Sequence, residues 1–248
     1  MLGILNTVQS KGSAFFQFIK EGLVMANRFL TPPSLSHPAN GSAEFDGASD
    51  YIQLDTPFSY TNHTIAAWIY AEGISTTIFD NRDVNDDGIR LILGGGNVMF
   101  YQLNGIDKTH TISQDQWYFV AGTYDGTTQK LYVDGSLVSS GATSQIISVS
   151  TYGARIGRST YENNYWNGNL ANVAIWNRAL SSDEINSVMW KNYDALEASE
   201  KSGLQAWYSL DDVASPSASL ATMEALAVDK DATIENTAAI TAAINALS

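Results

Sequence analysis

The sequence predicts an all-β protein in which residues 41–211 form a two-sheet antiparallel sandwich, with short helical N- and C-terminal arms. From residue 41 onward, apolar residues recur at every second position in short runs, which is the period of a half-buried strand. No long helical pattern separates these runs, so the strands are expected to pair antiparallel. With 44% hydrophobic, 11% aromatic and 16% charged residues, the chain has the composition of a protein that buries a large core.

The strands are delimited by Gly, Asn and Asp residues, which favour turns. The predicted strands cover residues 43–46, 51–54, 64–70, 77–79, 89–93, 98–103, 117–124, 130–134, 154–157, 170–176 and 204–210. Asp134-Gly135 follows one of them and predicts a hairpin turn. Ser181 and Glu184 have the spacing of a capping box and predict the start of a helix near 182–196.

Both ends of the chain differ in character from the strand region. Residues 1–40 are interpreted as an N-terminal arm with a short docking helix near 13–29, which Thr31-Pro32-Pro33 closes off. Residues 212–248 are Ala-rich with apolar residues at helical spacing, which predicts a helical C-terminal arm. Such short helices are marginal alone. Each arm is therefore expected to pack on the sandwich or on another subunit of an assembly.

The charge balance restricts the partners that the protein can have. Thirteen basic and twenty-six acidic residues give a net charge of −13, which disfavours nucleic acid and anionic membrane surfaces as partners. There is no cysteine, so disulfides and thiolate metal sites are excluded. We find no signal peptide and no transmembrane segment in the sequence, because its apolar runs are short and interrupted.

Four blocks of the sequence resemble a known family. These blocks are EFDGASDYIQL at 44–54, TIAAWIY at 64–70, WYFVAGTYDGTTQKLYVDG at 117–135 and WNGNLANVAIWNRALSSDEI at 166–185. Their order and spacing resemble the laminin-G-like, concanavalin A-like jelly roll. The resemblance implies a two-sheet sandwich that binds carbohydrates or protein receptors, often with a structural calcium, and is sometimes attached to enzymes.

The candidate cofactor is Ca²⁺, and the candidate ligands are Asp83, Asn85 and Asp87. The run from Asp83 to Gly88 matches the first six positions of a calcium loop, whose oxygens at alternate positions converge on one cation. The twelfth position should be a bidentate Glu but is Gly94. The alternative is an Asx-rich turn between two strands, in which the side chains bond their own backbone.

A second calcium candidate comes from the resemblance alone. Many relatives carry an acidic pair before the strand that ends in Asn-Arg-Ala-Leu, and these residues share a metal with an Asp near the first strands. In this chain the pair is replaced by Ala171 and Asn172, while Asp46 and Asp50 remain. The site would lose both charge and a ligand, so the structural calcium of the family is in doubt here.

The candidate sugar-binding residues are Tyr161, Asn163, Asn164 and Tyr165. Aromatic rings can stack on a pyranose while side-chain amides bond its hydroxyl groups, and this loop supplies both. The neighbouring Trp166 is expected to pack against the edge of the sandwich. Three further tryptophans on predicted strands are also expected in the core: Trp68, Trp117 and Trp176.

Catalytic motifs are not found. Hydrolases of this fold place their carboxylates as Glu-x-Asp-x-x-Glu, a spacing that this sequence lacks. His37, His63 and His110 are isolated and expected to be surface or half-buried residues. We therefore expect a non-enzymatic, lectin-like surface protein that binds a glycan or a host-surface receptor. A bacteriophage virion component of head-decoration or fibre type, at the virion surface, is favoured over a secreted or cell-surface carbohydrate-binding module, and both over a glycoside hydrolase.

Overall fold

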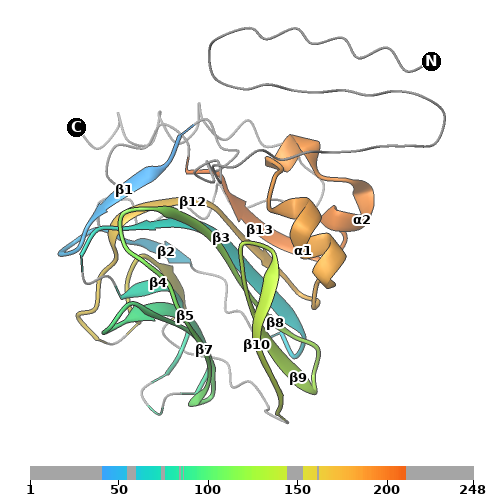
Figure 1. Ribbon diagram of the computed structural model, residues 1–248, viewed down its shortest axis with the longest axis horizontal. Coiled ribbons are helices and arrows are strands. Elements are labelled where there is room, and N and C mark those ends of the chain that lie inside the picture. The colour runs from blue at the N-terminus through green and yellow to red at the C-terminus, as the bar shows by residue number, and fades with distance from the viewer. Residues whose placement is uncertain are drawn as a thin grey trace, which may run out of the picture. The chain divides into compact units, whose positions relative to one another are not determined.

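The computed structural model describes residues 41–54, 60–73, 76–83, 85, 87–143, 153–160 and 162–210. These residues form two antiparallel β-sheets that pack face to face, which confirms the predicted sandwich (Figure 1). The predicted arms at 1–40 and 212–248 lie outside the described residues. Within the described part of the chain, no helix has the length and apolar character needed to span a membrane.

The first sheet has seven strands in the order β1-β12-β3-β8-β9-β10, and β13 pairs with β12. Its strands are β1 (Ala43–Asp46), β3 (His63–Ala71), β8 (Trp117–Tyr124), β9 (Thr128–Val133), β10 (Ser136–Ala142), β12 (Asn167–Trp176) and β13 (Leu204–Tyr208). The second sheet has six strands in the order β2-β11-β4-β5-β6-β7. Its strands are β2 (Ile52–Leu54), β4 (Thr77–Asp80), β5 (Ile89–Gly94), β6 (Val98–Leu103), β7 (Ile106–Thr111) and β11 (Ala154–Ile156).

The main core lies between the inner faces of the two sheets. Alternate residues of each strand point into it, as in the buried-intermediate alternation of β5. Gly122 of β8 lets the ring of Tyr101 cross from the opposite sheet, because a Cβ atom at Gly122 would lie 2.4 Å from Tyr101 Cδ2. Trp166 is fully buried in this core, as predicted.

A buried polar group sits within the same core. His63 is 1% exposed, so the expectation of a surface or half-buried residue was wrong. Its Nε2 lies 2.5 Å from the hydroxyl oxygen of Tyr101, and its ring packs 5.9 Å from that of Tyr124. The Tyr124 hydroxyl donates to the carbonyl oxygens of Gly126 and Thr143. The contact between His63 of β3 and Tyr101 of β6 joins the two sheets.

A second apolar cluster lies on the outer face of the seven-stranded sheet, where helical segments cover it (Figure 1). Trp68 and Trp176 are fully buried there, as predicted. Trp117 only packs against this cluster and is half-buried, so its placement in the core was wrong. It lies at the start of β8 beside Tyr70, beyond the area that the helices cover.

The helical region is shorter than the sequence pattern predicted. The predicted capping box of Ser181 and Glu184 is present and begins α1. The helical segments are α1 (Ser182–Val188), the 3₁₀ helix η1 (Tyr193–Ala195) and α2 (Ala198–Lys201). The first helix therefore ends well before residue 196. The carbonyl oxygen of Met189, the C-cap residue of α1, accepts the indole N–H of Trp68.

Two strands were missed by the sequence pattern, β7 and β10. Both lie at sheet edges and have mostly exposed or half-buried side chains, so their apolar alternation is weak. The predicted Asp134-Gly135 turn is confirmed, since both residues have positive φ angles, 49° and 75°, and join β9 to β10.

Candidate ligand-binding face

The outer face of the six-stranded sheet carries a row of polar side chains, one from each strand. Adjacent members are Cα partners in the strand register, so their side chains point to the same face. We call these residues the polar row: Gln53, Arg155, Asp80, Arg90, Gln102 and Asp107. The Gln102 amide donates to Asp107 Oδ1 at 2.8 Å. The row spans the sheet from β2 to β7.

An ion pair lies buried near the middle of the polar row. Arg82 follows β4, and its guanidinium group bonds the Asp80 carboxylate through Nε at 3.1 Å and through Nη2 at 2.9 Å. Both side chains are at most 1% exposed. The backbone N–H of Arg82 also donates to Asp80 Oδ1, which folds the chain back over the strand end. A pair this deeply buried is part of the scaffold of the face, because neither group can meet solvent.

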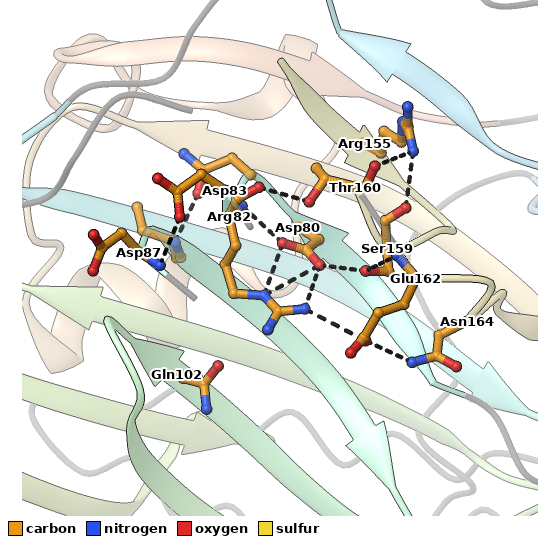
Figure 2. A network of polar contacts seen from close by, with 12 residues as sticks. Asp80, Arg82, Asp83, Asp87, Gln102, Arg155, Ser159, Thr160, Glu162 and Asn164 are labelled. Atoms are coloured by element: carbon orange, nitrogen blue, oxygen red, sulfur yellow. Dashed lines mark hydrogen bonds and ion pairs between the residues drawn. The ribbon is translucent and has the colours of Figure 1, made fainter. Parts of the chain in front are cut away.

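The loop of residues 158–165, which follows β11, is fixed over this ion pair (Figure 2). The hydroxyl of Ser159 donates to Asp80 Oδ2, and the hydroxyl of Thr160 donates to the carbonyl oxygen of Arg82. Arg155 Nη1 donates to the carbonyl oxygens of both Ser159 and Thr160, at 3.0 and 2.7 Å. The carboxylate of Glu162 lies 3.6 Å from the Arg82 guanidinium group. Ser159, Thr160 and Glu162 are therefore anchored by contacts with the buried ion pair and with Arg155.

The predicted sugar-binding residues that the structure describes lie on this loop. Asn163 and Asn164 are exposed, and Asn164 donates to Glu162 Oε2 at 2.7 Å. Tyr165 is half-buried and forms an antiparallel bridge with Arg158, whose guanidinium carbon lies 4.9 Å from the centre of its ring. The fourth predicted residue, Tyr161, lies outside the described residues.

The sequence pattern did not identify the aromatic partner of this loop, Tyr51. Two arginines lie over the Tyr51 ring. The guanidinium carbon of Arg158 is 5.1 Å from the ring centre, and that of Arg155 is 5.4 Å from it. Arg158 is thus in contact with two tyrosine rings, Tyr51 and Tyr165, and donates to Asn163 Oδ1 at 3.3 Å. Aromatic, amide and guanidinium groups are gathered at one end of the polar row.

The predicted calcium ligands form a turn that directly follows Arg82 in the chain. Asp83 Oδ1 accepts the backbone N–H groups of Asn85 at 2.8 Å and Asp87 at 3.2 Å. These are the bonds of the Asx turn that was the alternative to a calcium loop. Across the described ranges, no three His, Cys, Asp or Glu side chains are grouped to hold a metal ion. One Asp83 oxygen is thus already committed to the backbone, and calcium binding at this loop stays a prediction.

In the second calcium candidate, the side chain of Asp46 also accepts hydrogen bonds from the backbone. The Asp46 carboxylate accepts the N–H groups of Ala48, Ser49 and Asp50 and the hydroxyl of Ser49. Burial raises the pKa of Asp46, but the bonds from Ser49, Ala48 and Asp50 outweigh it and lower that pKa to about 2. At the position of the absent acidic pair, Asn172 forms a bulge with φ of 48°.

The two predicted loops, far apart in sequence, meet at Arg82. Its carbonyl oxygen receives the Thr160 hydroxyl, and its next residue is Asp83 (Figure 2). Sequence reasoning missed the polar row that lies beside them. The available signal was a charged residue at an outward position within an apolar strand, as with Arg90 in IRLIL and Arg155 in ARI.

Comparisons with known proteins identify the fold family. A family described as the concanavalin A-like lectin/glucanases superfamily matches residues 46–186. A Bacteroides ovatus structure assigned as a carbohydrate-binding protein superposes with a TM-score of 0.55 and 21% identity, covering 68% of this chain and 52% of that one. This chain therefore spans about half the length of that protein. A search of curated proteins finds no match.

Two further solved structures share the fold. Domain 4 of AbnA, an extracellular arabinanase from Geobacillus stearothermophilus solved with arabinotriose, has a TM-score of 0.51 and 18% identity, covering 61% of this chain and 79% of that one. The CBM40 module of a Ruminococcus gnavus sialidase has a TM-score of 0.50 and 14% identity, covering 61% and 97%. At these identities the likeness concerns the fold. Because the family match covers more than half of its residues, this chain belongs to the concanavalin A-like lectin/glucanases superfamily.

Proposed function

We propose that the protein is a glycan-binding module whose ligand lies on the 158–165 loop and the adjoining end of the polar row. The observation that carries this proposal is the placement of exposed amides beside tyrosine rings on a rigid base. Asn163 and Asn164 are exposed next to Tyr165, and the buried Asp80–Arg82 pair holds the loop below them. Amides can bond sugar hydroxyl groups while a ring face packs on the pyranose C–H groups.

Binding without turnover fits the carboxylates of this face. Glycoside hydrolysis needs two carboxyl groups that face each other across the sugar. Asp80 is fully buried and bonded to Arg82, and Glu162 is engaged by Asn164 and lies close to the same arginine. Asp80 is therefore not placed to transfer a proton to a ligand, and Glu162 is held by these contacts. The solved structures named above, which include a sialidase module and a domain solved with arabinotriose, support a lectin-like role.

A glycan array probed with the labelled full-length protein tests this function. We expect binding to at least one oligosaccharide, with single-site affinity in the millimolar range, about −4 kcal/mol. The double variant Asn163→Ala and Asn164→Ala should lose most of this binding while its unfolding transition is unchanged. Gln116→Ala removes an exposed amide from the bend before β8, a strand of the other sheet, and is the matched control. If the parent binds no glycan, or if the double variant binds as well as the parent, the proposal is wrong.

The proposal also includes a cellular setting for the protein. We place the module outside the cell or on a virion surface, where weak sites in many copies can raise avidity by roughly 10²–10⁴. The virion role rests on the two terminal arms as attachment segments for other subunits. Deleting residues 1–30 should then abolish incorporation into the parent assembly and leave glycan binding intact. A truncated protein that still assembles would contradict the attachment role.

A further inference from the structure

Arginine is concentrated on the candidate ligand-binding face. The chain has six arginines and a net charge of −13, and four of the six belong to the polar row or its adjoining loops. These four are Arg82, Arg90, Arg155 and Arg158. In an acidic protein, such a cluster stands out against the remaining charge of the molecule.

Within the described part of the chain, one of these four arginines forms an ion pair with a carboxylate. Arg82 is paired with Asp80 and lies close to Glu162. Among the described residues, the other three form no ion pair. Arg90 is half-buried, its side chain makes no hydrogen bond within the same ranges, and its buried Nε has no partner there. Arg158 also has a buried Nε without a partner in these ranges, and its side chain donates to a neutral amide, that of Asn163.

Two of these guanidinium groups lie near the same tyrosine ring. Those of Arg155 and Arg158 both have their central carbon within 5.4 Å of the centre of the Tyr51 ring. Arg155 also donates to Gln53, Ser159 and Thr160. Desolvation lowers the pKa of Arg155, and the positive charge of Arg158 lowers it further. Two like charges in a partly desolvated setting repel each other, and an anion bound between them would remove that repulsion.

Arg158 lies beside two tyrosine rings, and its Nη2 donates to Asn163 Oδ1. Its guanidinium carbon is 5.1 Å from the centre of the Tyr51 ring and 4.9 Å from that of the Tyr165 ring. A guanidinium group can offer a planar carboxylate two parallel N–H bonds. On the polar row, Arg90 is the Cα partner of Gln102, whose Oε1 is buried and has no partner.

We propose that the ligand of this face is a carboxylate-bearing saccharide, which Arg90, Arg155 and Arg158 recognise. This inference rests on the proposed glycan binding and adds the chemical class of the sugar. Arg155 and Arg158 bind the carboxylate at the edge of the sheet near Tyr51, and Arg90 binds a second acidic or hydroxyl group farther along the row. The net negative charge elsewhere on the protein disfavours polyanions that do not match this arrangement.

The test is an array of acidic oligosaccharides that carry N-acetylneuraminic, galacturonic or glucuronic acid, each printed beside its methyl ester and a neutral counterpart. Methyl esterification removes the charge and keeps the rest of the sugar. We expect binding to at least one acid and a loss of at least tenfold for its ester. Binding should weaken as NaCl rises from 50 to 500 mM, since screening reduces exposed charge interactions.

Variants identify the residues responsible. Arg158→Gln and Arg90→Gln should each weaken binding of the preferred acid about tenfold, whereas Lys130→Gln, which removes one positive charge from the other sheet, should not. Equal binding of acid and ester with loss in the Asn163 and Asn164 variant would overturn the acidic-sugar inference and leave the proposed function standing. Binding to no printed glycan would overturn both. Equal losses in all three charge variants would show an effect of net charge and would also overturn the inference.

Discussion

Acidification should destabilise the protein through one buried imidazole. His63 is enclosed between the two sheets, where its Nε2 contacts the Tyr101 hydroxyl and its ring packs near Tyr124. Desolvation lowers the pKa of His63 to about 3 from its ordinary value of 6.5, against an opposing hydrogen bond with the backbone of Tyr60. The folded protein therefore keeps this side chain neutral in a pH range where the unfolded chain protonates it.

The size and sign of the effect follow from proton linkage. Between pH 6.5 and 3 the unfolded state binds one proton more than the folded state, so stability falls as the pH falls. Above pH 6.5 neither state is protonated and the contribution disappears. At about 1.36 kcal/mol per pKa unit, the loss reaches about 2 kcal/mol at pH 5 and at most about 5 kcal/mol near pH 3.

Urea denaturation at pH 7.5, 6.5, 5.5 and 5.0 measures this loss in a range where most carboxyl groups are still ionised. The variant His63→Gln cannot titrate, so its free energy of unfolding should change by less than about 0.5 kcal/mol over the same range. Comparing slopes removes any constant cost of the substitution. Parallel pH profiles for the parent and the variant would refute the reasoning and assign the pH dependence to other groups.

Three other substitutions test the packing, the buried charge and the Asp83 turn. Gly122→Ala should destabilise the fold by about 1–3 kcal/mol, because its Cβ would overlap the Tyr101 ring, and an unchanged urea midpoint would contradict that contact. Asp80→Ala should cost about 3–5 kcal/mol by leaving Arg82 buried without its main partner; a loss below 1 kcal/mol in urea denaturation would mean that the pair is hydrated. Asp83→Ala should cost about 0.5–2 kcal/mol in the presence of chelator, as for loss of a capping carboxylate. A calcium-dependent rise in melting temperature that only the parent protein has would instead make this turn a metal site.

The sandwich could be predicted because its inward-facing residues repeat every second position. The runs 64–70 and 117–124 carry this signal in the sequence itself, and they form the paired centre of the larger sheet. Edge strands lack it. β10 has exposed residues such as Leu137 and polar ones such as Ser140, and it is held by backbone bonds to β9, which leave no pattern in side-chain type.

The candidate site was only half predictable for a related reason. The Tyr-Asn-Asn-Tyr loop and the Asp-rich turn are local patterns, so their composition could be read directly from the sequence. The polar row depends on register. Gln53 and Arg155 are Cα partners although about a hundred residues separate them, and the Arg155–Gln53 hydrogen bond of 2.8 Å exists only after the strands pair. Burial of His63 likewise depends on which residues of the opposite sheet enclose it.

The one-residue-per-strand construction of the polar row has an evolutionary consequence. Along each strand the neighbours of a row residue point inward, so an exchange at Arg90 or Gln53 leaves the packing of Ile89 or Ile52 untouched. Mutation can therefore vary the chemistry of the face one strand at a time, at little risk to folding. Asp80 and Arg155 are exceptions, because Asp80 is paired with the buried Arg82 and Arg155 donates to the carbonyl oxygens of Ser159 and Thr160. Lineages of this fold that diverge in ligand preference should thus vary around a fixed acidic centre.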